Sequence, residues 1–321
     1  MLKVDGISRT YGDLKVVDKL SFNVNEGEFV ALLGPSGCGK STSLKMIAGL
    51  EGPDEGSIEL DGRDITLLSP GDRKLAMVFQ SYALFPHLKV EENILFGLQA
   101  RKVPKDEQKK RLDSVVELVG LGDHLQKKPG QLSGGQCQRV ALARAIVAQA
   151  KLCLMDEPLS NLDAKLRNEM RTEIRALQQR LGMSVIYVTH DQVEAMSMAD
   201  RIVLMNNGKV EQIDVPEALY SKPKTIFTAQ FIGSPPMNII GSGENCRGIR
   251  PEHIEISEEG MPASVVSCDY HGADTIVLAD VSAAGEDQKL IKIRYPGHAM
   301  FAPQQRLTVR WALENEHKFL I

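Results

Sequence analysis

A glycine-rich segment at residues 34–41, with the sequence GPSGCGKS, constrains the fold of this chain more than any other feature. It follows an apolar run at 28–33 and precedes a segment at about 39–49 with helical character. The pattern GxxxxGK[ST] between a strand and a helix is typical of a phosphate-binding loop. Glycines let the backbone wrap around phosphate groups, and the start of the helix adds positive potential. The segment therefore predicts an α/β fold in which a buried strand leads into this loop.

The residue types in the loop predict a role for several positions. Lys40 would reach the β- and γ-phosphates of a nucleotide, Ser41 would coordinate Mg²⁺, and Thr42 would support the phosphates. A chance glycine-rich turn before a helix is the competing interpretation, and the flanking strand and helix argue against it. The residues expected to bind the nucleotide here are Gly34, Pro35, Ser36, Gly37, Cys38, Gly39, Lys40, Ser41 and Thr42.

A second apolar run, at 151–155, ends in two carboxylates, Asp156 and Glu157. Buried strands place such residues at the carboxyl edge of a sheet, where ligands bind. We expect Asp156 to hold Mg²⁺, often through water, and Glu157 to orient an attacking water or accept its proton. Taken alone, a strand that ends in a solvated loop explains the pair equally well. The phosphate-binding loop favours the catalytic interpretation.

A second anion site is predicted at Leu132-Ser133-Gly134-Gly135-Gln136, before a long apolar helix at about 138–150. The serine hydroxyl, the glycine N–H groups and the helix dipole would together bind an anion. LSGGQ between the phosphate-binding loop and the acidic pair resembles the ATPase subunits of ABC transporters. The resemblance implies an ATP- and Mg²⁺-dependent P-loop NTPase with a RecA-like core, an antiparallel β subdomain and a helical subdomain at about 86–150.

Four further positions match the pattern of this family in the same order along the chain. By resemblance, Tyr11 would stack on adenine, Gln80 would sense Mg²⁺ and the attacking water, and His190 would contact the γ-phosphate. Ser160-Asn161-Leu162-Asp163 resembles the loop that contacts the opposite subunit, with Asp163 in the nucleotide site. Each match alone is weak, because a packing tyrosine, a surface glutamine and a strand-end histidine are common. Gln80, Glu157 and His190 are the expected catalytic residues, and Ser41, Gln80 and Asp156 the expected metal ligands.

The family resemblance also implies a dimer in which two subunits enclose two ATP molecules, each giving its LSGGQ loop to the other. This chain carries one complete set of motifs, so a homodimer is favoured. Cys137 departs from the family, since arginine or glutamine is usual directly after LSGGQ. We expect that change to alter local contacts and to leave Ser133 and both glycines in place.

The pattern of apolar residues along the rest of the chain predicts its domains. Short apolar runs within residues 1–30 predict antiparallel strands, 105–120 and 164–181 have helical periodicity, and 184–189 is a third buried strand. We expect a nucleotide-binding domain at 1–233, a linker at Ser234-Pro235-Pro236, and a small OB-like β domain at 234–321. Strands are expected there at 275–278 and 289–293.

The C-terminal sequence resembles the ATPases of carbohydrate importers, of the maltose and glycerol-3-phosphate types, through FIGSPPMN at 231–238 and GIRPEH at 248–253. Only about ten residues separate Asn238 from Gly248, where that family commonly has several tens. We therefore expect a shortened domain that either braces a dimer or binds a regulator.

Composition limits the partners. Among 321 residues the net charge is −4, and the five cysteines form no CxxC pair, so neither nucleic acid binding nor a zinc site is expected. No N-terminal signal peptide and no uncharged apolar stretch near 18 residues is evident. If the protein serves a membrane, other chains must therefore provide the pore. The resemblance to importer ATPases implies two permease subunits and an extracytoplasmic solute-binding protein, with this chain peripheral at the cytoplasmic face of the inner membrane. The competing functions are a soluble ABC ATPase acting on ribosomes or DNA, and an exporter ATPase.

Overall fold

The phosphate-binding loop follows β3, a central strand of a six-stranded sheet. The computed structural model describes residues 1–241, 246–282 and 290–319. The strand order is β10-β9-β3-β8-β7-β6; β3 is parallel to β8 and β9, and β7 is parallel to β6 and β8. The strands are β3 (Phe29–Leu33), β6 (Ala76–Val78), β7 (Leu152–Asp156), β8 (Ser184–Thr189), β9 (Arg201–Asn206) and β10 (Lys209–Asp214). The three buried strands expected from the apolar runs are thus confirmed.

Both faces of this sheet are buried, and successive residues of β7 show why its sequence is apolar throughout. Leu152 and Leu154 belong to a core cluster that also contains Leu44 and Ile47 of α1 (Lys40–Ala48). Cys153 and Met155 belong to the cluster on the other face, which contains side chains of α2 to α5. Because side chains alternate across a strand, a strand covered on both faces needs a continuous apolar run.

A four-stranded antiparallel sheet covers the far side of α1, with strand order β2-β1-β4-β5. Its turn at Asp61-Gly62 has φ angles of 52° and 75°, the left-handed pair expected in a two-residue hairpin. The strands are β1 (Leu2–Tyr11), β2 (Leu14–Val24), β4 (Glu55–Leu60) and β5 (Arg63–Asp64). The antiparallel structure expected for the start of the chain is therefore present.

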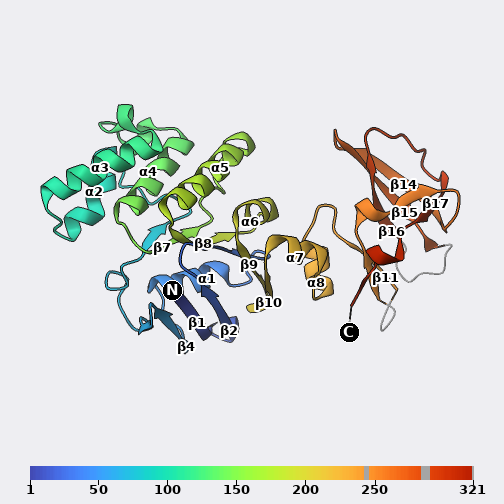
Figure 1. The fold of residues 1–321 in the computed structure, drawn as a ribbon, viewed down its shortest axis with the longest axis horizontal. Helices are drawn as coiled ribbons and strands as arrows, with labels where there is room; N and C mark the ends of the chain where they lie inside the picture. Colours follow the sequence, from blue (N-terminus) through green and yellow to red (C-terminus); the bar gives the residue numbers. More distant parts are fainter. Residues whose placement is uncertain (242–245, 283–289, 320–321) are drawn as a thin grey trace. The chain divides into compact units, whose positions relative to one another are not determined.

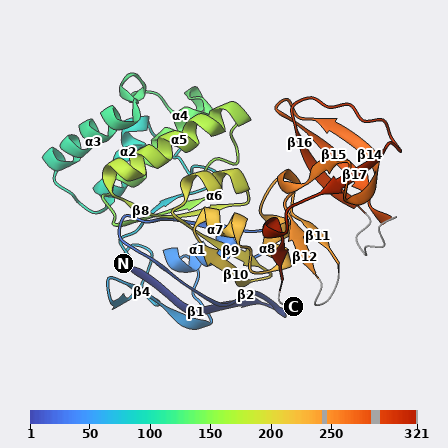
Figure 2. The ribbon, with the colours of Figure 1, turned by 45° about the vertical axis from the view of Figure 1, so that its right-hand side comes forward.

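Helices α2, α3 and α4 are inserted between β6 and β7, and with α5 they gather on one side of the six-stranded sheet (Figures 1 and 2). Asp163 caps the start of α5, where its Oδ1 accepts from the N–H of Leu166 at 3.0 Å, and Gly182 at φ 60° ends that helix as expected. The helices are α2 (Val90–Ala100), α3 (Lys105–Val119), α4 (Gly134–Val147), α5 (Ala164–Leu181) and α6 (Gln192–Met198), with short 3₁₀ turns at Gly122–His124 and Pro129–Gln131.

Helix α4 begins earlier than the sequence predicts. The expected start near residue 138 is wrong, because Ser133 is the N-cap residue and the two glycines already belong to the first turn. The hydroxyl of Ser133 accepts from the N–H of Gln136 at 3.3 Å, and Oε1 of Gln136 accepts from the N–H of Ser133 at 2.9 Å. This reciprocal capping fixes the loop directly on the helix end.

The chain divides into two units at Met1–Pro216 and Glu217–Ile321, earlier than the expected boundary at residue 233. The reason is Arg250, a buried arginine of the second unit. Its guanidinium donates to the backbone oxygens of Tyr220 at 2.6 Å and Ile232 at 2.5 Å, and lies 4.0 Å from the ring centroid of Tyr220. These contacts tie α7 (Pro216–Ser221) and α8 (Ile226–Phe231) to the C-terminal part of the chain.

After α8, the described residues of the second unit form two antiparallel sheets. Strands are present at both expected places, although Lys289 at the start of the second lies outside the described residues. One sheet is β11 (Asn238–Ile240), β12 (Arg247–Ile249) and β18 (His317–Lys318); the other, in the order β13-β17-β14-β15-β16, is β13 (Glu255–Ser257), β17 (Arg306–Arg310), β14 (Met261–Tyr270), β15 (Asp274–Asp280) and β16 (Leu290–Pro296).

A buried arginine also anchors α1 behind the phosphate-binding loop. Arg73 is only 3% exposed, and its guanidinium donates to four backbone oxygens at 2.7 to 3.0 Å. The acceptors are Met46 and Ile47 at the end of α1, and Thr66 and Leu68 in the segment that follows β5.

We predict that Arg73→Leu lowers the free energy of unfolding by about 3 kcal/mol or more, because several buried carbonyl groups lose their donors at once. Urea unfolding of the purified variant measures this loss. Arg63→Ala is the matched control, since Arg63 is exposed and should change the free energy by less than about 0.5 kcal/mol. Equal stability of the two variants would contradict the anchoring role of Arg73.

Candidate nucleotide-binding site

The phosphate-binding loop has a backbone conformation that residues other than glycine rarely adopt. Gly37 and Gly39 have φ angles of 81° and 99°, in the region where L side chains are strained. A Cβ atom on Gly39 would also lie 2.6 Å from the backbone oxygen of Val16 in β2. The loop is therefore held against the antiparallel sheet at a distance that only glycine permits.

Lys40 places a buried positive charge inside this loop. The residue is 5% exposed, and its Nζ donates to the backbone oxygens of Gly34 at 2.8 Å and Pro35 at 2.9 Å. No carboxylate within the described residues forms an ion pair with it. A buried ammonium without a counter-ion favours the entry of an anion, and the start of α1 adds donor N–H groups.

Ser41 and Asp156 meet at the carboxyl edge of the sheet. The hydroxyl of Ser41 donates to Oδ1 of Asp156 at 2.8 Å. Burial raises the pKa of the Asp156 carboxyl, and the hydrogen bond from Ser41 opposes that rise. Serine hydroxyl and carboxylate oxygens are ligands that Mg²⁺ prefers, so these two residues fit the predicted metal site.

Glu157, Gln80 and His190 come together as the sequence predicts. His190 Nδ1 lies 3.1 Å from Oε2 of Glu157, and Nε2 of Gln80 lies 3.4 Å from the same oxygen. Gln80 also donates to the hydroxyl of Ser160 at 3.3 Å, and Asn161 donates to the backbone oxygen of Gln80 at 2.9 Å. One carboxylate therefore faces both polar side chains that are candidates to handle an attacking water.

Glu157 itself has an unusual backbone. Its φ angle is 43°, in the left-handed region, while its N–H donates to the backbone oxygen of Val188 in β8 at 3.0 Å. Non-glycine residues in this region cost about 1–3 kcal/mol and cluster at functional sites. This left-handed backbone turns the chain directly after Asp156. The two neighbouring carboxylates therefore have different partners, Ser41 for Asp156 and His190 for Glu157.

The LSGGQ loop packs on the segment that contains Asp163. A Cβ atom on Gly134 would lie 3.2 Å from Leu162, and one on Gly135 would lie 3.0 Å from Leu166. The side chain of Gln136 contacts another element, with its Nε2 3.0 Å from Nε2 of His124. The two glycines therefore permit close packing, and their N–H groups, in the first turn of α4, have no acceptor within that helix. The substituted Cys137 lies beside this loop, and its Sγ is 3.7 Å from the backbone oxygen of Pro129.

Two predicted residues have other contacts in this structure. Tyr11 is 43% exposed; its hydroxyl donates to a carboxylate oxygen of Glu51, and the guanidinium of Arg9 lies 5.1 Å from its ring centroid. Asp163 uses its carboxylate to cap α5. Their proposed roles toward adenine and toward a second subunit stay predictions.

The structure adds a network that the sequence does not reveal. Buried Glu194 of α6 accepts from the hydroxyls of Tyr187 at 2.9 Å and Thr189 at 2.7 Å. Asp191 caps α6, and Arg167 lies 3.7 Å from that carboxylate while donating to the backbone oxygen of Leu162 at 3.0 Å. The network holds the residues on both sides of His190 and connects them to the loop at 160–163. Its link from Asp191 through Arg167 to Leu162 joins segments that are distant in sequence, so only the tertiary fold identifies it.

The site combines a glycine-rich loop that holds a buried lysine, a serine–aspartate pair, and a glutamate with a strained backbone. Together these features define a P-loop ATPase site. The ABC transporter family profile matches residues 17–160, and the TOBE domain profile matches residues 247–319. Together with the LSGGQ loop and a relative that is 44% identical along nearly the whole chain, these matches show that the chain belongs to the ABC transporter ATPases. The family assignment and the expected P-loop fold with an OB-like C-terminal domain are confirmed.

Several relatives similar to this chain are named as import ATP-binding proteins. The sn-glycerol-3-phosphate import ATP-binding protein of Ruegeria sp. strain TM1040 is 44% identical over 334 residues, covering 97% of this chain and 94% of that protein. The spermidine/putrescine import ATP-binding protein of Bacillus thuringiensis strain Al Hakam is 47% identical over 290 residues, covering 90% and 86%. The solved dimeric bacterial ABC transporter cassette MJ0796 has a TM-score of 0.60 and 33% identity, covering 67% of this chain and 99% of that one.

We predict that Gly39→Ala weakens ATP binding about tenfold or more, because the loop must move away from β2 to accommodate the methyl group. Titration with a fluorescent ATP analogue measures the dissociation constant. Gly97→Ala in α2 is the control, since a Cβ atom there meets nothing within 4 Å. An unchanged dissociation constant for Gly39→Ala would show that the loop geometry is not limiting.

The buried carboxyl of Glu194 should make the free energy of unfolding depend on pH. Burial raises the pKa of its carboxyl, so the protonated form is favoured by folding, and its stabilising contribution is lost as the pH rises through that value. Glu194→Gln keeps an acceptor oxygen and has no proton to lose. We therefore expect its free energy of unfolding, relative to the unmodified chain, to increase as the pH rises from 4 to 8 in urea titrations. A difference that is constant or decreases over this range would contradict the account.

Proposed function

We propose that this chain binds MgATP between two copies of itself and hydrolyses it to drive a membrane importer. The observation that carries the proposal is the buried ammonium of Lys40, which forms no ion pair with any described carboxylate, next to Ser41, whose hydroxyl bonds Asp156. The ABC family assignment supports ATP as the nucleotide and hydrolysis as the reaction.

Each residue of the site has a separate role in ATP binding or hydrolysis. Lys40 exchanges its carbonyl contacts for phosphate oxygens, and the N–H groups at the start of α1 bind the same phosphates. Ser41 and Asp156 hold Mg²⁺, which neutralises charge on the phosphates when bound. Glu157 accepts a proton from, or orients, the attacking water. His190 and Gln80 face that carboxylate and position it and the water against the γ-phosphate.

The LSGGQ loop supports a role across a dimer interface. Its N–H groups and the hydroxyl of Ser133 lie at the start of a 14-residue helix, and no described hydrogen bond connects them to the phosphate-binding loop of the same chain. The similar MJ0796 cassette was solved as a dimer, once in a state bound to ADP and Pi. We infer that Ser133, Gly134, Gly135 and Gln136 contact the nucleotide held by the second copy, with Asp163 beside them.

The proposed membrane partners are two permease subunits and, through them, an extracytoplasmic solute-binding protein. In the described part of the chain, no helix is both long and apolar enough to cross a bilayer. We place the chain on the cytoplasmic face of the inner membrane, as a peripheral subunit. The alternative of a soluble ATPase acting on ribosomes or DNA is not favoured, because the relatives are named as import proteins.

The imported solute is proposed from the relatives. Glycerol-3-phosphate or a related glycerol- or sugar-containing solute is the first candidate, because that relative aligns with nearly the whole chain. A polyamine is the second candidate, because the spermidine/putrescine relative has the higher identity. Purification of the chain from membranes with its permease and binding protein tests both. Stimulation of ATPase activity by the binding protein loaded with one solute would identify it, and recovery of ribosomes without permease subunits would contradict the importer proposal.

We predict that Glu157→Gln retains ATP binding and lowers turnover by about 100-fold or more, because the general base is lost while the phosphate contacts remain. Phosphate release and nucleotide titration measure the two properties separately. Glu169→Gln on the exposed side of α5 should leave both unchanged. Full turnover in Glu157→Gln would remove Glu157 from the mechanism.

A further inference from the structure

Two cavities lie at the amino-terminal ends of β7 and β8, whereas the nucleotide site lies at the carboxyl ends of the strands. Lys151, directly before β7, lines both cavities, and Ser184 at the start of β8 lines the first. Strand β7 has 5 residues, so about 16 Å separates this edge from Asp156. A ligand here would therefore not overlap the nucleotide.

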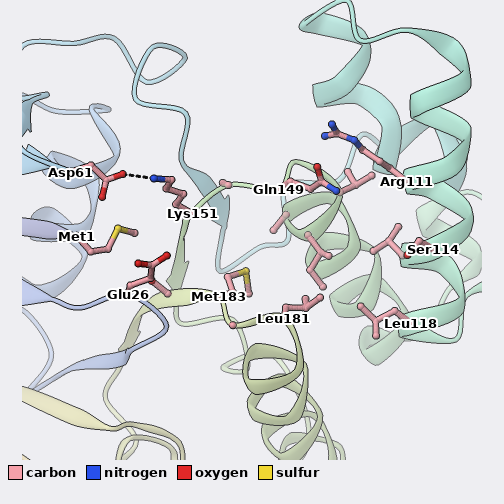
Figure 3. Close-up of a pocket in the computed structure, with 17 residues that line it drawn as sticks. Met1, Glu26, Asp61, Arg111, Ser114, Leu118, Gln149, Lys151, Leu181 and Met183 are labelled. Atoms are coloured by element: carbon pink, nitrogen blue, oxygen red, sulfur yellow. Dashed lines mark hydrogen bonds and ion pairs between the residues drawn. The ribbon is translucent and has the colours of Figure 1, made fainter.

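The first cavity, of about 410 Å³, is lined by apolar side chains together with several polar ones, which include the carboxylates Glu26 and Asp61 (Figure 3). Leu118 of α3, Leu181 of α5 and Met183 before β8 supply apolar surface in the close-up, and Arg111 and Lys151 lie toward its margins. Small-molecule sites are typically cavities of about 300–1,000 Å³ with mostly apolar walls and a few polar groups. This cavity has both the size and the composition of such a site.

The second cavity, of about 400 Å³, is strongly cationic. Its lining contains five basic side chains and two carboxylates, Asp61 and Asp72. Among the described residues, Arg63, Lys74 and Arg101 form no ion pair, and all three are exposed. Several unpaired cations around one hollow favour an anionic ligand.

The two cavities adjoin at four residues that line both of them: Asp61 of the hairpin, and Gln149, Ala150 and Lys151 in the connection from α4 to β7. Gln149 in this connection has a φ angle of 51°, a left-handed backbone that is uncommon outside glycine. Lys151 and Asp61 form an ion pair at 2.7 Å, with the side chains 71% and 45% exposed. Exposed pairs contribute little, so Lys151 is available to an incoming anion.

We propose that this pair of cavities binds a small amphipathic organic anion. The apolar part would lie against Leu118, Leu181 and Met183, and a phosphate, sulfate or carboxylate group would be held by Lys151 with Arg63 and Arg101. The ligand would contact the antiparallel sheet, the inserted helices and the connection at 148–151 together. Binding would restrain the inserted helices relative to the six-stranded sheet, remote from the nucleotide.

Isothermal titration of the full chain with octyl phosphate, below the concentration at which it forms micelles, tests the site. We expect one saturable site per chain. Arg63→Ala combined with Arg101→Ala should weaken binding about tenfold, since charge-assisted contacts are lost. Ser114→Phe, an exposed position on the rim of the first cavity, should also weaken binding by filling it. Arg306→Ala, at an exposed arginine of the second unit, is the control and should bind normally.

Two further titrations test whether the cations select the ligand and whether its site is separate from the nucleotide site. Octan-1-ol and octylamine should bind at least about tenfold more weakly than octyl phosphate if the cations select the ligand. Saturation with ATP should leave the octyl phosphate affinity unchanged. The proposal is overturned by absent saturable binding, by equal affinity for the alcohol, by displacement with ATP, or by normal binding in both cavity variants. None of these outcomes depends on ATP hydrolysis or on a membrane partner.

Discussion

The ammonium group of Lys40 is the interaction on which the nucleotide site depends. It is almost fully buried, and among the described residues its hydrogen-bond acceptors are two backbone oxygens of its own loop and the sulfur of Cys38. A charge held in this way is costly until an anion arrives, so the loop favours phosphate before any base is recognised. The surrounding fold maintains that arrangement, because β3 is bordered by parallel strands on both sides and Gly39 is fixed against β2.

The six-stranded sheet has the nucleotide site at the carboxyl ends of its strands and the two cavities at their amino ends. Its carboxyl edge collects Asp156, Glu157 and His190 from two neighbouring strands, and the strained φ angle of Glu157 turns adjacent carboxylates toward different partners. The LSGGQ loop is fixed to this region indirectly, through close packing of its glycines on Leu162 and Leu166. A movement of the loop at 160–163 would thus reach both the LSGGQ loop and, through Arg167 and Asp191, the segment at His190. The amino edge carries the two cavities.

Much of this could be predicted from the sequence because the groups that bind phosphate come from short contiguous motifs. Each of these motifs, the loop at 34–41, the acidic pair and LSGGQ, is complete within a few residues. Apolar runs indicate the strands that precede the loop and the acidic pair. The missed features depend on partners distant in the chain. Arg250 shifts the domain boundary through backbone oxygens 18 to 30 residues away, and Arg73 joins α1 to a later loop. The predicted start of the helix after LSGGQ is too late because glycines are poor helix formers, whereas here a reciprocal cap compensates.

The central claim is that each nucleotide site is completed by the LSGGQ loop of a second copy, and subunit mixing tests it most directly. Lys40→Ala and Ser133→Arg copies should each be inactive alone, because one lacks the phosphate contact and the other the opposing loop. Mixed in equal amounts, they should recover ATPase activity, about a quarter of the unmodified level if half the dimers are mixed and each holds one intact site. If both residues instead serve the nucleotide of their own chain, no intact site forms in the mixture. Activity that stays at the level of the separate variants would contradict the account.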